Sequence, residues 1–217
     1  DYTVVSAELQ TNGRGQMGTK WSTQESKNLT FSVYKDVSFL KVEQSFYISI
    51  VVCLSIFRVL EKHLIKNLTI KWPNDILSDN KKLAGILIEN VIKINQLQDS
   101  IIGIGLNVNQ TEFKDLPRAS SLRLVAGKVF DLEEILQEII RQIKIYFILL
   151  ENGQMDHLKS EYESYLFRKG KPSSFRDIDG KLFAGIILGI SNSGNLKIQV
   201  EDAIAKEFNL KEISLLY

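Results

Sequence analysis

The sequence has little of what marks secreted, membrane-bound or nucleic-acid-binding proteins. Its 217 residues include a single cysteine, so the chain can form no internal disulfide, and we expect a reducing compartment. The formal net charge is only +1, which predicts no broad attraction to nucleic acid or to membrane surfaces. No signal peptide is visible, and the chain has neither repeats nor low-complexity segments. These absences favour a globular protein of the cytoplasm.

The cysteine lies in an apolar run, residues 47–57 (YISIVVCLSIF), which is shorter than the roughly 20 apolar residues of a membrane-spanning helix. We therefore expect Cys53 to be a buried structural thiol. A chain of this length that is 44% hydrophobic can bury a core without disulfides. It begins at Asp1, in a stretch that is typical of a strand, so we expect further residues to precede it in the protein.

Hydrophobic periodicity divides the chain into two parts. Up to residue 167 strand patterns and helical patterns alternate, and the helix that begins at Asp131 has a capping pair with Glu134. From residue 168 the helical periodicity ends, and short strand patterns separated by IDGK, SNSGN and VEDA predict a small β-barrel. We predict one domain over residues 1–167 and a second over 168–217. The expected strands are 2–10, 28–35, 68–73, 83–90 and 100–109, and the expected helices are 43–63, 131–153 and 155–167.

The segment GRGQMG, residues 13–18, matches the G-x-G-x-x-G fingerprint of dinucleotide-binding folds and nearly matches a phosphate-binding loop. Both need a helix directly after the loop, because the helix N-terminus holds the phosphates. A polar and then strand-like segment follows here, so neither an NAD site nor a phosphate loop is favoured. The loop still offers glycines for close backbone approach, Arg14 for a carboxylate or phosphate, and Trp21 for stacking on a base. A solvent-exposed hairpin loop is the alternative for this segment alone.

A second group of polar residues lies around a predicted hairpin turn. The turn would bring Asp75 and Lys82 close together, and Gly85 would leave room for a ligand. A lysine at the mouth of an apolar pocket suits a carboxylate or a phosphate, whereas the alternative is a flanking surface lysine. Farther along, Asn107 ends an apolar strand, either as a buried hydrogen-bonding group or as a turn residue.

Four segments, in this order and at this spacing, resemble the biotin protein ligases, also called biotin–[acetyl-CoA-carboxylase] ligases: AELQTNGRGQMGTKW (7–21), KWPNDIL (71–77), KKLAGILIE (81–89) and GIGLNVN (103–109). Each is weak alone, but four in order are specific, and the resemblance covers nearly the whole chain. It implies an α+β fold, with a mixed-sheet catalytic domain of the biotin/lipoate ligase type and a small SH3-like C-terminal β-barrel. Some members carry an N-terminal helix-turn-helix that represses transcription. None is visible here, so we expect a ligase that is not a repressor.

The resemblance implies a two-step reaction. The biotin carboxylate attacks the α-phosphate of ATP to give biotinyl-5'-AMP and pyrophosphate, and a lysine of a biotin carboxyl carrier domain then takes the biotin and releases AMP. Two anions meet in the first step, so cations and Mg²⁺ are expected at the site. The expected partners are ATP, biotin and the carrier domain of a biotin-dependent carboxylase, without nucleic acid or membrane, and a homodimer is compatible with the resemblance.

By the same resemblance, the catalytic residues are Lys82, Arg14 and Asp75. Lys82 would contact the biotin carboxylate and the α-phosphate, and Asp75 would orient or deprotonate the incoming lysine and is the one candidate protein ligand for Mg²⁺. The implied biotin-binding residues are Gln10, Gly13, Arg14, Gly15, Gln16, Lys82 and Gly85. The implied nucleotide-binding residues are Trp21, Lys71, Asn74 and Asn107.

Two departures from the family pattern bear on ligand binding. Many members have a second arginine where Gln16 stands, so this loop carries one fewer cation, and we expect its retention of the adenylate to differ. The Ser-Thr-Asn segment that hydrogen-bonds the biotin ureido ring lies upstream of the glycine loop in the family and is not among residues 1–217. If the protein began at Asp1, biotin binding would be impaired.

Two other functions stay open at this point. A lipoate or octanoate ligase or transferase shares the catalytic fold, although GRGQMGTKW and KWPND favour biotin. A non-catalytic adenylate-binding module would bind its ligand without transferring it, and the presence of Arg14, Lys82 and Asp75 argues against such a module.

Overall fold

The computed structural model describes residues 1–217, apart from the side chain of Met17. Six strands form one sheet in the order β1-β4-β8-β7-β6-β5, and each neighbouring pair is antiparallel. The α+β class is confirmed, but the sheet is antiparallel in every ladder rather than mixed as expected, and parallel pairing occurs at isolated bridges. The strands are β1 Thr3–Ser6, β4 Leu29–Asp36, β5 Leu68–Lys71, β6 Asp75–Ser78, β7 Lys81–Lys93 and β8 Gln96–Leu106.

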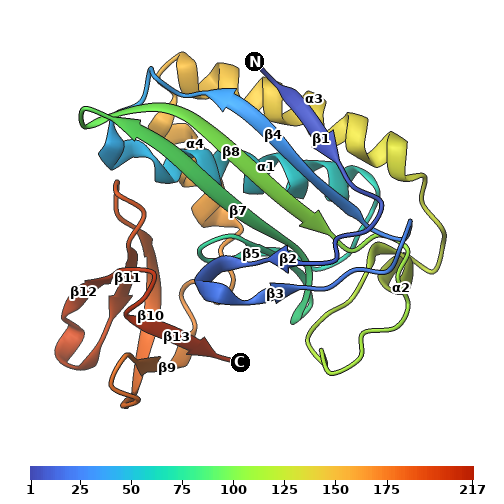
Figure 1. Ribbon diagram of the computed structural model, residues 1–217. Coiled ribbons are helices and arrows are strands. Elements are labelled where there is room, and N and C mark those ends of the chain that lie inside the picture. The colour runs from blue at the N-terminus through green and yellow to red at the C-terminus, as the bar shows by residue number, and fades with distance from the viewer.

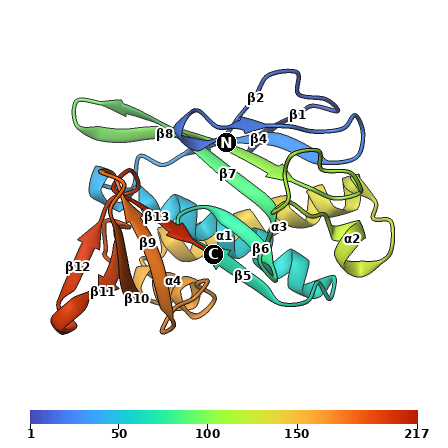
Figure 2. The ribbon, with the colours of Figure 1, turned by 90° about the horizontal axis from the view of Figure 1, so that it is seen from below.

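Three helices cover one face of this sheet, α1 Phe46–Lys62, α3 Leu132–Glu151 and α4 Met155–Ser164 (Figures 1 and 2). Helix α1 is apolar on nearly every side because it is packed against the sheet and against the other two helices. The segment Val42–Lys62 has 21 residues and is apolar enough to cross a membrane, so the length argument against a span does not hold. Its composition is explained instead by burial, and burial also raises the pKa of the Cys53 thiol.

Helix α3 begins as the capping signal predicts, because the Asp131 carboxylate accepts a hydrogen bond from the Glu134 amide at 3.0 Å. Its largely buried Glu138 is bound by the last turn of α1, where Lys62 and His63 both contact its carboxylate. Burial would raise the pKa of Glu138, but the hydrogen bonds from these two side chains outweigh it and hold the pKa below its usual value.

Five further strands form a second antiparallel sheet in the order β12-β11-β10-β9-β13. None of the pairings described joins β12 to β13, so the expected closure into a barrel is not seen. The strands are β9 Pro172–Asp177, β10 Leu182–Ile190, β11 Leu196–Gln199, β12 Ala205–Phe208 and β13 Ile213–Leu216.

The two sheets are tied together at the edge strand β5. The amide of Phe167 donates to the carbonyl of Ile70 at 2.8 Å, and the Trp72 indole N–H donates to the carbonyl of Gly194 at 2.8 Å. Buried side chains of both sheets belong to one continuous hydrophobic cluster. The C-terminal sheet is therefore packed firmly beside the edge of the first sheet at which the KWPND segment lies.

A two-stranded ribbon lies over the face of the large sheet that the helices leave open (Figures 1 and 2). It consists of β2 Gly13–Arg14 and β3 Lys20–Trp21, with the short 3-10 helix η1 Gln16–Gly18 at its tip. The helix that a dinucleotide fold requires after its glycine loop is replaced by this ribbon. The remaining short elements are η2 Val42–Gln44, α2 Leu122–Ala126 and η3 Glu201–Ala203.

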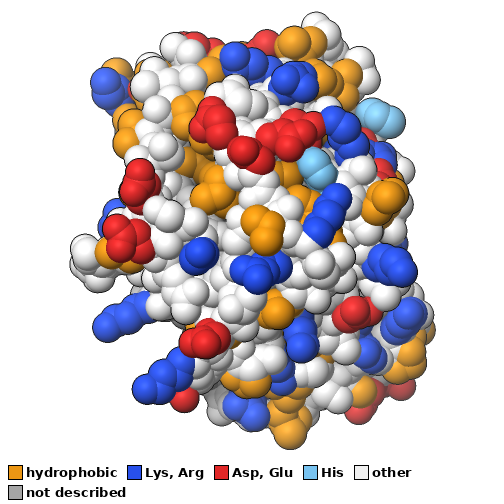
Figure 3. Space-filling model, turned by 90° about the vertical axis from the view of Figure 1, so that its right-hand side faces the viewer, with side chains coloured by type: hydrophobic (Ala, Val, Ile, Leu, Met, Phe, Trp, Pro, Cys, Tyr) orange, Lys and Arg blue, Asp and Glu red, His pale blue; other side chains and the backbone are white. Residues whose placement is uncertain are grey.

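The face that carries α2 and the start of α3 has acidic and basic side chains interspersed with hydrophobic ones (Figure 3). Such a mixed surface is what a formal net charge of +1 produces when both signs are spread over the chain.

Several boundaries differ from the sequence-based expectations. Strand β1 ends at Ser6, whereas the expected strand ran to residue 10, because the chain leaves the sheet to enter the ribbon. Strands β7 and β8 form one long hairpin that turns at Ile94 and Asn95, and neither this turn nor α2 was expected. The expected helices 43–63, 131–153 and 155–167 correspond to α1, α3 and α4, with shorter ends.

Candidate functional site

A cavity of about 390 Å³ lies between the β2–β3 ribbon and the open face of the large sheet. Most of the residues that the sequence singled out meet here, although they come from five strands and from the loops and turns between strands. The predicted residues that line it are Gln10, Arg14, Gly15, Gln16, Trp21, Lys71, Asn74, Asp75, Lys82 and Gly85. Gly13 lies in the ribbon beside it, paired with Trp21, and Asn107 lines a neighbouring cavity.

The charged centre of the cavity is the pair Lys82 and Asp75. The β6–β7 hairpin places the Lys82 Nζ 2.6 Å from one Asp75 carboxylate oxygen, and the Lys71 Nζ lies 3.7 Å from the other. A Cβ on Gly85 would stand 2.8 Å from the Lys82 Nζ, so glycine is what lets the lysine lie across β7. Two cations thus share one carboxylate, which leaves positive charge for an anionic ligand.

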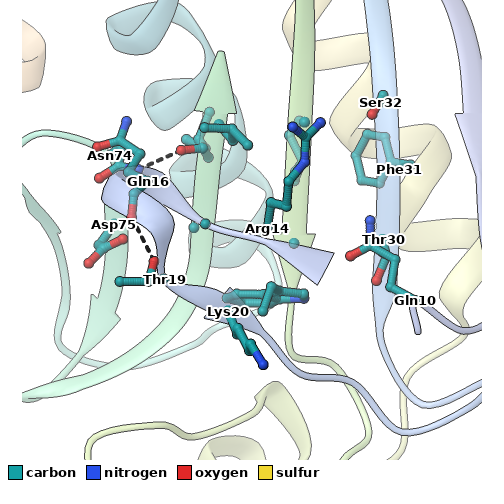
Figure 4. A pocket seen from close by; sticks show the side chains of 18 of the residues that line it. Gln10, Arg14, Gln16, Thr19, Lys20, Thr30, Phe31, Ser32, Asn74 and Asp75 are labelled. Atoms are coloured by element: carbon teal, nitrogen blue, oxygen red, sulfur yellow. Dashed lines mark hydrogen bonds between the residues drawn. The ribbon is translucent and has the colours of Figure 1, made fainter. Parts of the chain in front are cut away.

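Arg14 lines the cavity from the ribbon, and its side chain lies in front of β8 in Figure 4. Its guanidinium is 3.6 Å from the Glu89 carboxylate, and both side chains are well exposed, at 72% and 53%. An exposed pair of this kind contributes little to stability, so Arg14 is free to leave Glu89 for a ligand. At the tip of the ribbon the Thr19 hydroxyl donates to the Gln16 carbonyl at 2.8 Å and closes the loop (Figure 4).

Trp21, in strand β3 of the ribbon, lines the cavity and lies between the ribbon and the sheet. Its indole lies directly on β8, where a Cβ on Gly105 would meet the ring at 2.4 Å. The Lys82 Nζ is 5.6 Å from the ring centroid. The indole N–H is buried and has no hydrogen-bond partner, which is an unfavourable state for a buried donor and one that a ligand acceptor would relieve.

A second cavity of about 380 Å³ lies on the other side of Trp21. Trp21 and Lys82 line both cavities, together with Thr19 and Lys20, so these four residues form the wall between the two. The second cavity has a mostly apolar lining from Phe113, Leu116 and Pro117, in the loop between β8 and α2. An aromatic wall and apolar sides suit a flat ring such as a nucleobase.

The two predicted asparagines hold backbone in place around these cavities. The Asn74 amide donates to the Ile86 carbonyl at 2.5 Å, and the Asn107 amide donates to the Ser120 carbonyl at 3.0 Å. Each therefore uses one amide hydrogen on the protein itself and retains other donor and acceptor capacity. The bracing role of these side chains could not be inferred from their place at strand ends.

The loop that carries the second cavity is fastened to the backbone of Lys82. The Lys82 amide donates to the Arg118 carbonyl at 2.7 Å, and the Ser120 amide donates to the Lys82 carbonyl at 3.0 Å. Because Asn107 binds the Ser120 carbonyl, the loop, the lysine and the end of β8 form one hydrogen-bonded unit. A shift of the loop would be transmitted directly to the backbone of Lys82.

Several lining residues were not foreseen. In β8, Gly103 and Gly105 lie two residues apart and so share a face, which a Gly-x-Gly pattern in a strand could have indicated. Arg118 and Tyr217 carry no local sequence signal, since both enter the site from loops and sheet ends that only the fold brings together. Burial raises the pKa of Tyr217, the Asp75 carboxylate raises it further, and Arg118 and Lys82 oppose both.

The site has few groups that bind metals. Among the residues described, no cluster of three His, Cys, Asp or Glu side chains could hold an ion. Asp75 and Glu89 are the carboxylates in the lining of the larger cavity, and both are paired with cations. A divalent cation would therefore find most of its ligands on a bound phosphate group rather than on the protein.

Comparison with known proteins agrees with this geometry. Residues 1–107 match the Biotin/lipoate A/B protein ligase family. The bifunctional ligase/repressor BirA of Bacillus subtilis is 32% identical over 216 residues, which is 95% of this chain and 64% of that relative. The biotin–[acetyl-CoA-carboxylase] ligase of Mycobacterium tuberculosis is 27% identical over 92% of this chain and 74% of its own length. The chain thus spans just under two thirds of the length of the BirA relative.

Among solved structures, the biotin protein ligase from Aquifex aeolicus in complex with biotin and ATP is 30% identical, with a TM-score of 0.83. The alignment covers 100% of this chain and 90% of that one. A biotin protein ligase from Leishmania major in complex with biotinyl-5-AMP is 23% identical with a TM-score of 0.60, a likeness that concerns the fold alone.

Proposed function

The chain belongs to the biotin protein ligases of the biotin/lipoate A/B protein ligase family, and on that premise we propose that it is an ATP-dependent biotin ligase. It forms biotinyl-5'-AMP from biotin and ATP and transfers the biotin to a lysine of a biotin carboxyl carrier domain. The observation that carries the proposal is the arrangement of Lys82, Asp75 and Trp21 at the wall between two adjoining cavities.

In the first step a carboxylate oxygen of biotin attacks the α-phosphorus of ATP, and the bond to the pyrophosphate leaving group breaks. Lys82 and Lys71 supply positive charge where the two anions meet, and Asp75 keeps Lys82 directed across β7. Arg14 leaves the exposed pair with Glu89 and closes over the phosphates. The protein therefore lowers the barrier by placing fixed cations beside the charge that develops.

In the second step the ε-amine of the acceptor lysine attacks the acyl carbon of the mixed anhydride, and AMP leaves. The amine must lose a proton, and Asp75 is the lining carboxylate nearest to the reacting centre. Because Asp75 already pairs with Lys82 at 2.6 Å, we assign it the orientation of the amine as well as the final capture of its proton.

The two cavities divide the ligands between them in this proposal. The larger one, beside Gln10, Gln16 and Gly85, takes biotin, and the apolar one behind Trp21 takes the adenine. Asn74 and Asn107 hold the surrounding backbone, and Lys71 faces the phosphates. Mg²⁺ would come with the nucleotide and would neutralise phosphate charge when bound, and Asp75 is the lining carboxylate that we assign as its candidate protein ligand.

The test is pyrophosphate exchange with ATP, run with biotin and with lipoate, followed by transfer of labelled biotin to a carrier domain. Exchange and transfer with biotin alone are expected. Exchange with lipoate alone would place the chain among the lipoate ligases of the same fold. Tight biotin and ATP binding without transfer to any carrier domain would instead make it a non-catalytic adenylate-binding module.

The remaining assignments follow from the same proposal. We assign residues 1–167 to the catalytic domain and 168–217 to an SH3-like domain, supported by the two separate sheets. The acceptor is the carrier domain of a biotin-dependent carboxylase, and the enzyme works in the cytoplasm, without nucleic acid, either alone or as a homodimer. Sedimentation with and without biotin and ATP measures the assembly state.

A further inference from the structure

The C-terminal sheet reaches the two cavities through Tyr217, which directly follows β13. Its ring lines the cavity behind Trp21, and among the described residues that line either cavity it is the one from beyond residue 167. The C-terminus lies at the end of β5, where the Lys71 Nζ is 5.5 Å from the centroid of the Tyr217 ring (Figure 2). The second sheet therefore delivers one aromatic side chain to the nucleotide side of the site.

The Tyr217 ring contacts one aromatic side chain and two basic side chains. Phe167 packs its edge against it, with ring centroids 5.1 Å apart at an interplanar angle of 69°. The guanidinium carbon of Arg118 lies 4.5 Å from the ring centroid, and the Lys71 Nζ lies 5.5 Å from it. Both distances are within the range of a cation–π interaction.

These two cations have little else to fix them. Arg118 is exposed, and among the described residues no carboxylate forms an ion pair with its guanidinium. Lys71 competes with Lys82 for the same Asp75 carboxylate, which lies much closer to Lys82. Arg118 has a long side chain without an ion-pair partner and so samples many rotamers, and the Lys71 pair with Asp75 is long. An aromatic surface that restricts these side chains lowers the entropy cost of binding a phosphate.

We propose that Tyr217 is a positioning residue, which holds Arg118 and Lys71 at the border between the two cavities for the phosphates of the nucleotide. This inference rests on the proposed function, because it assigns the two cations to the nucleotide of that reaction. It gives the C-terminal sheet a defined part in ATP binding and adds Arg118 to the groups that contact the nucleotide. Arg118 and Tyr217 line the cavity behind Trp21 and not the larger one assigned to biotin, so the main effect is expected on ATP.

The test is the KM for ATP and the KM for biotin in pyrophosphate exchange. Replacing Tyr217→Leu is expected to raise the KM for ATP about three- to tenfold while the KM for biotin stays within about twofold. Tyr217→Phe keeps the ring and is expected to stay near the wild type for both substrates. Ile178→Ala, at an exposed position in the turn between β9 and β10 and away from both cavities, is the matched control and should change neither value.

A double-mutant cycle separates positioning from general damage to the fold. If Tyr217 acts through Arg118, adding Tyr217→Leu to Arg118→Ala should raise the KM for ATP by much less than it does in the wild type. Fully additive effects, an unchanged KM for ATP in Tyr217→Leu, or an equal rise for biotin would each overturn the inference. A wild-type protein without any biotin-dependent exchange would instead remove the proposed function, before the variants are compared.

Discussion

Gly105 is the position at which one added methyl group should disturb nucleotide binding with little effect on the fold. A Cβ there would stand 2.4, 2.6 and 2.8 Å from three atoms of the Trp21 indole, whereas ordinary contacts begin at 3.4 Å. The ring must therefore retreat by about 1 Å, since carbon atoms closer than about 3.5 Å repel strongly. Because Trp21 belongs to the ribbon and not to the sheet, we expect the ribbon to shift and β8 to keep its register.

Overpacking of this kind lowers the free energy of unfolding by about 1–3 kcal/mol. Because the ribbon can move, we expect a loss near the lower end of this range for Gly105→Ala. The same displacement moves the wall between the two cavities, so Gly105→Ala should raise the KM for ATP about tenfold, which corresponds to about 1.4 kcal/mol. The assay is pyrophosphate exchange with ATP varied at saturating biotin, together with the intrinsic fluorescence of the chain's two tryptophans.

Gly103→Ala is the matched control, two residues earlier on the same strand and the same face. Its Cβ would meet the Leu87 carbonyl at 3.2 Å, a contact that a shift of a few tenths of an ångström relieves, and it does not touch Trp21. If Gly103→Ala raised the KM for ATP as much as Gly105→Ala, or if Gly105→Ala left it unchanged, the indole would not be the wall of the nucleotide cavity.

Three further predictions concern single side chains. Lys82→Ala should lower adenylate formation about 100- to 1000-fold, whereas Lys81→Ala, at the exposed neighbouring position, should leave it unchanged; near-normal exchange in the first variant would refute the role of the lysine. Gln16→Arg adds a cation to the cavity lining and should slow release of the adenylate about three- to tenfold in a chase experiment, and faster release would contradict this. Glu138, whose pKa the neighbouring lysine and histidine hold low, stabilises the fold at pH values above its unfolded pKa, and this contribution disappears as the pH falls through its lower folded pKa. The free energy of unfolding should therefore fall less between pH 7 and pH 3 in Glu138→Gln than in the wild type, as measured by urea titrations at several pH values in this range.

The juxtaposition of Asp75 and Lys82 was predictable because a short hairpin fixes the distance between its own ends. The turn between them includes Asp79, which has a φ of 54° in a conformation that aspartate tolerates. The long β7–β8 hairpin gave no such signal, because Ile94 and Asn95 adopt φ values of 50° and 58° and isoleucine is a poor residue for that turn. Ile94 is 97% exposed and has a backbone conformation that isoleucine disfavours, so rules based on the residues common in turns do not predict a turn here.

Helix α2 could have been found from its ends. Ser121 caps it by accepting a hydrogen bond from the Leu124 amide at 3.2 Å, and Gly127 ends it with a φ of 72°. Tyr217 and Arg118 were beyond prediction for a different reason. Their contact depends on how the second sheet docks beside β5, and docking depends on packing between distant segments rather than on any local pattern.

The roles of the glycines in the site could be assigned only from the structure and not from the match to a motif. The sequence suggested that they let backbone amides approach a ligand, yet most of them make room for the protein's own groups. A Cβ on Gly13 would strike a backbone carbonyl of the partner strand, one on Gly15 a threonine hydroxyl, and one on Gly85 a lysine side chain. On Gly105 it would strike the indole ring, and Gly18 alone is required for its backbone conformation, with a φ of 75°. The spacing of these glycines therefore encodes the packing of a ribbon on a sheet, and the ligand chemistry belongs to the charged and aromatic side chains that this packing positions.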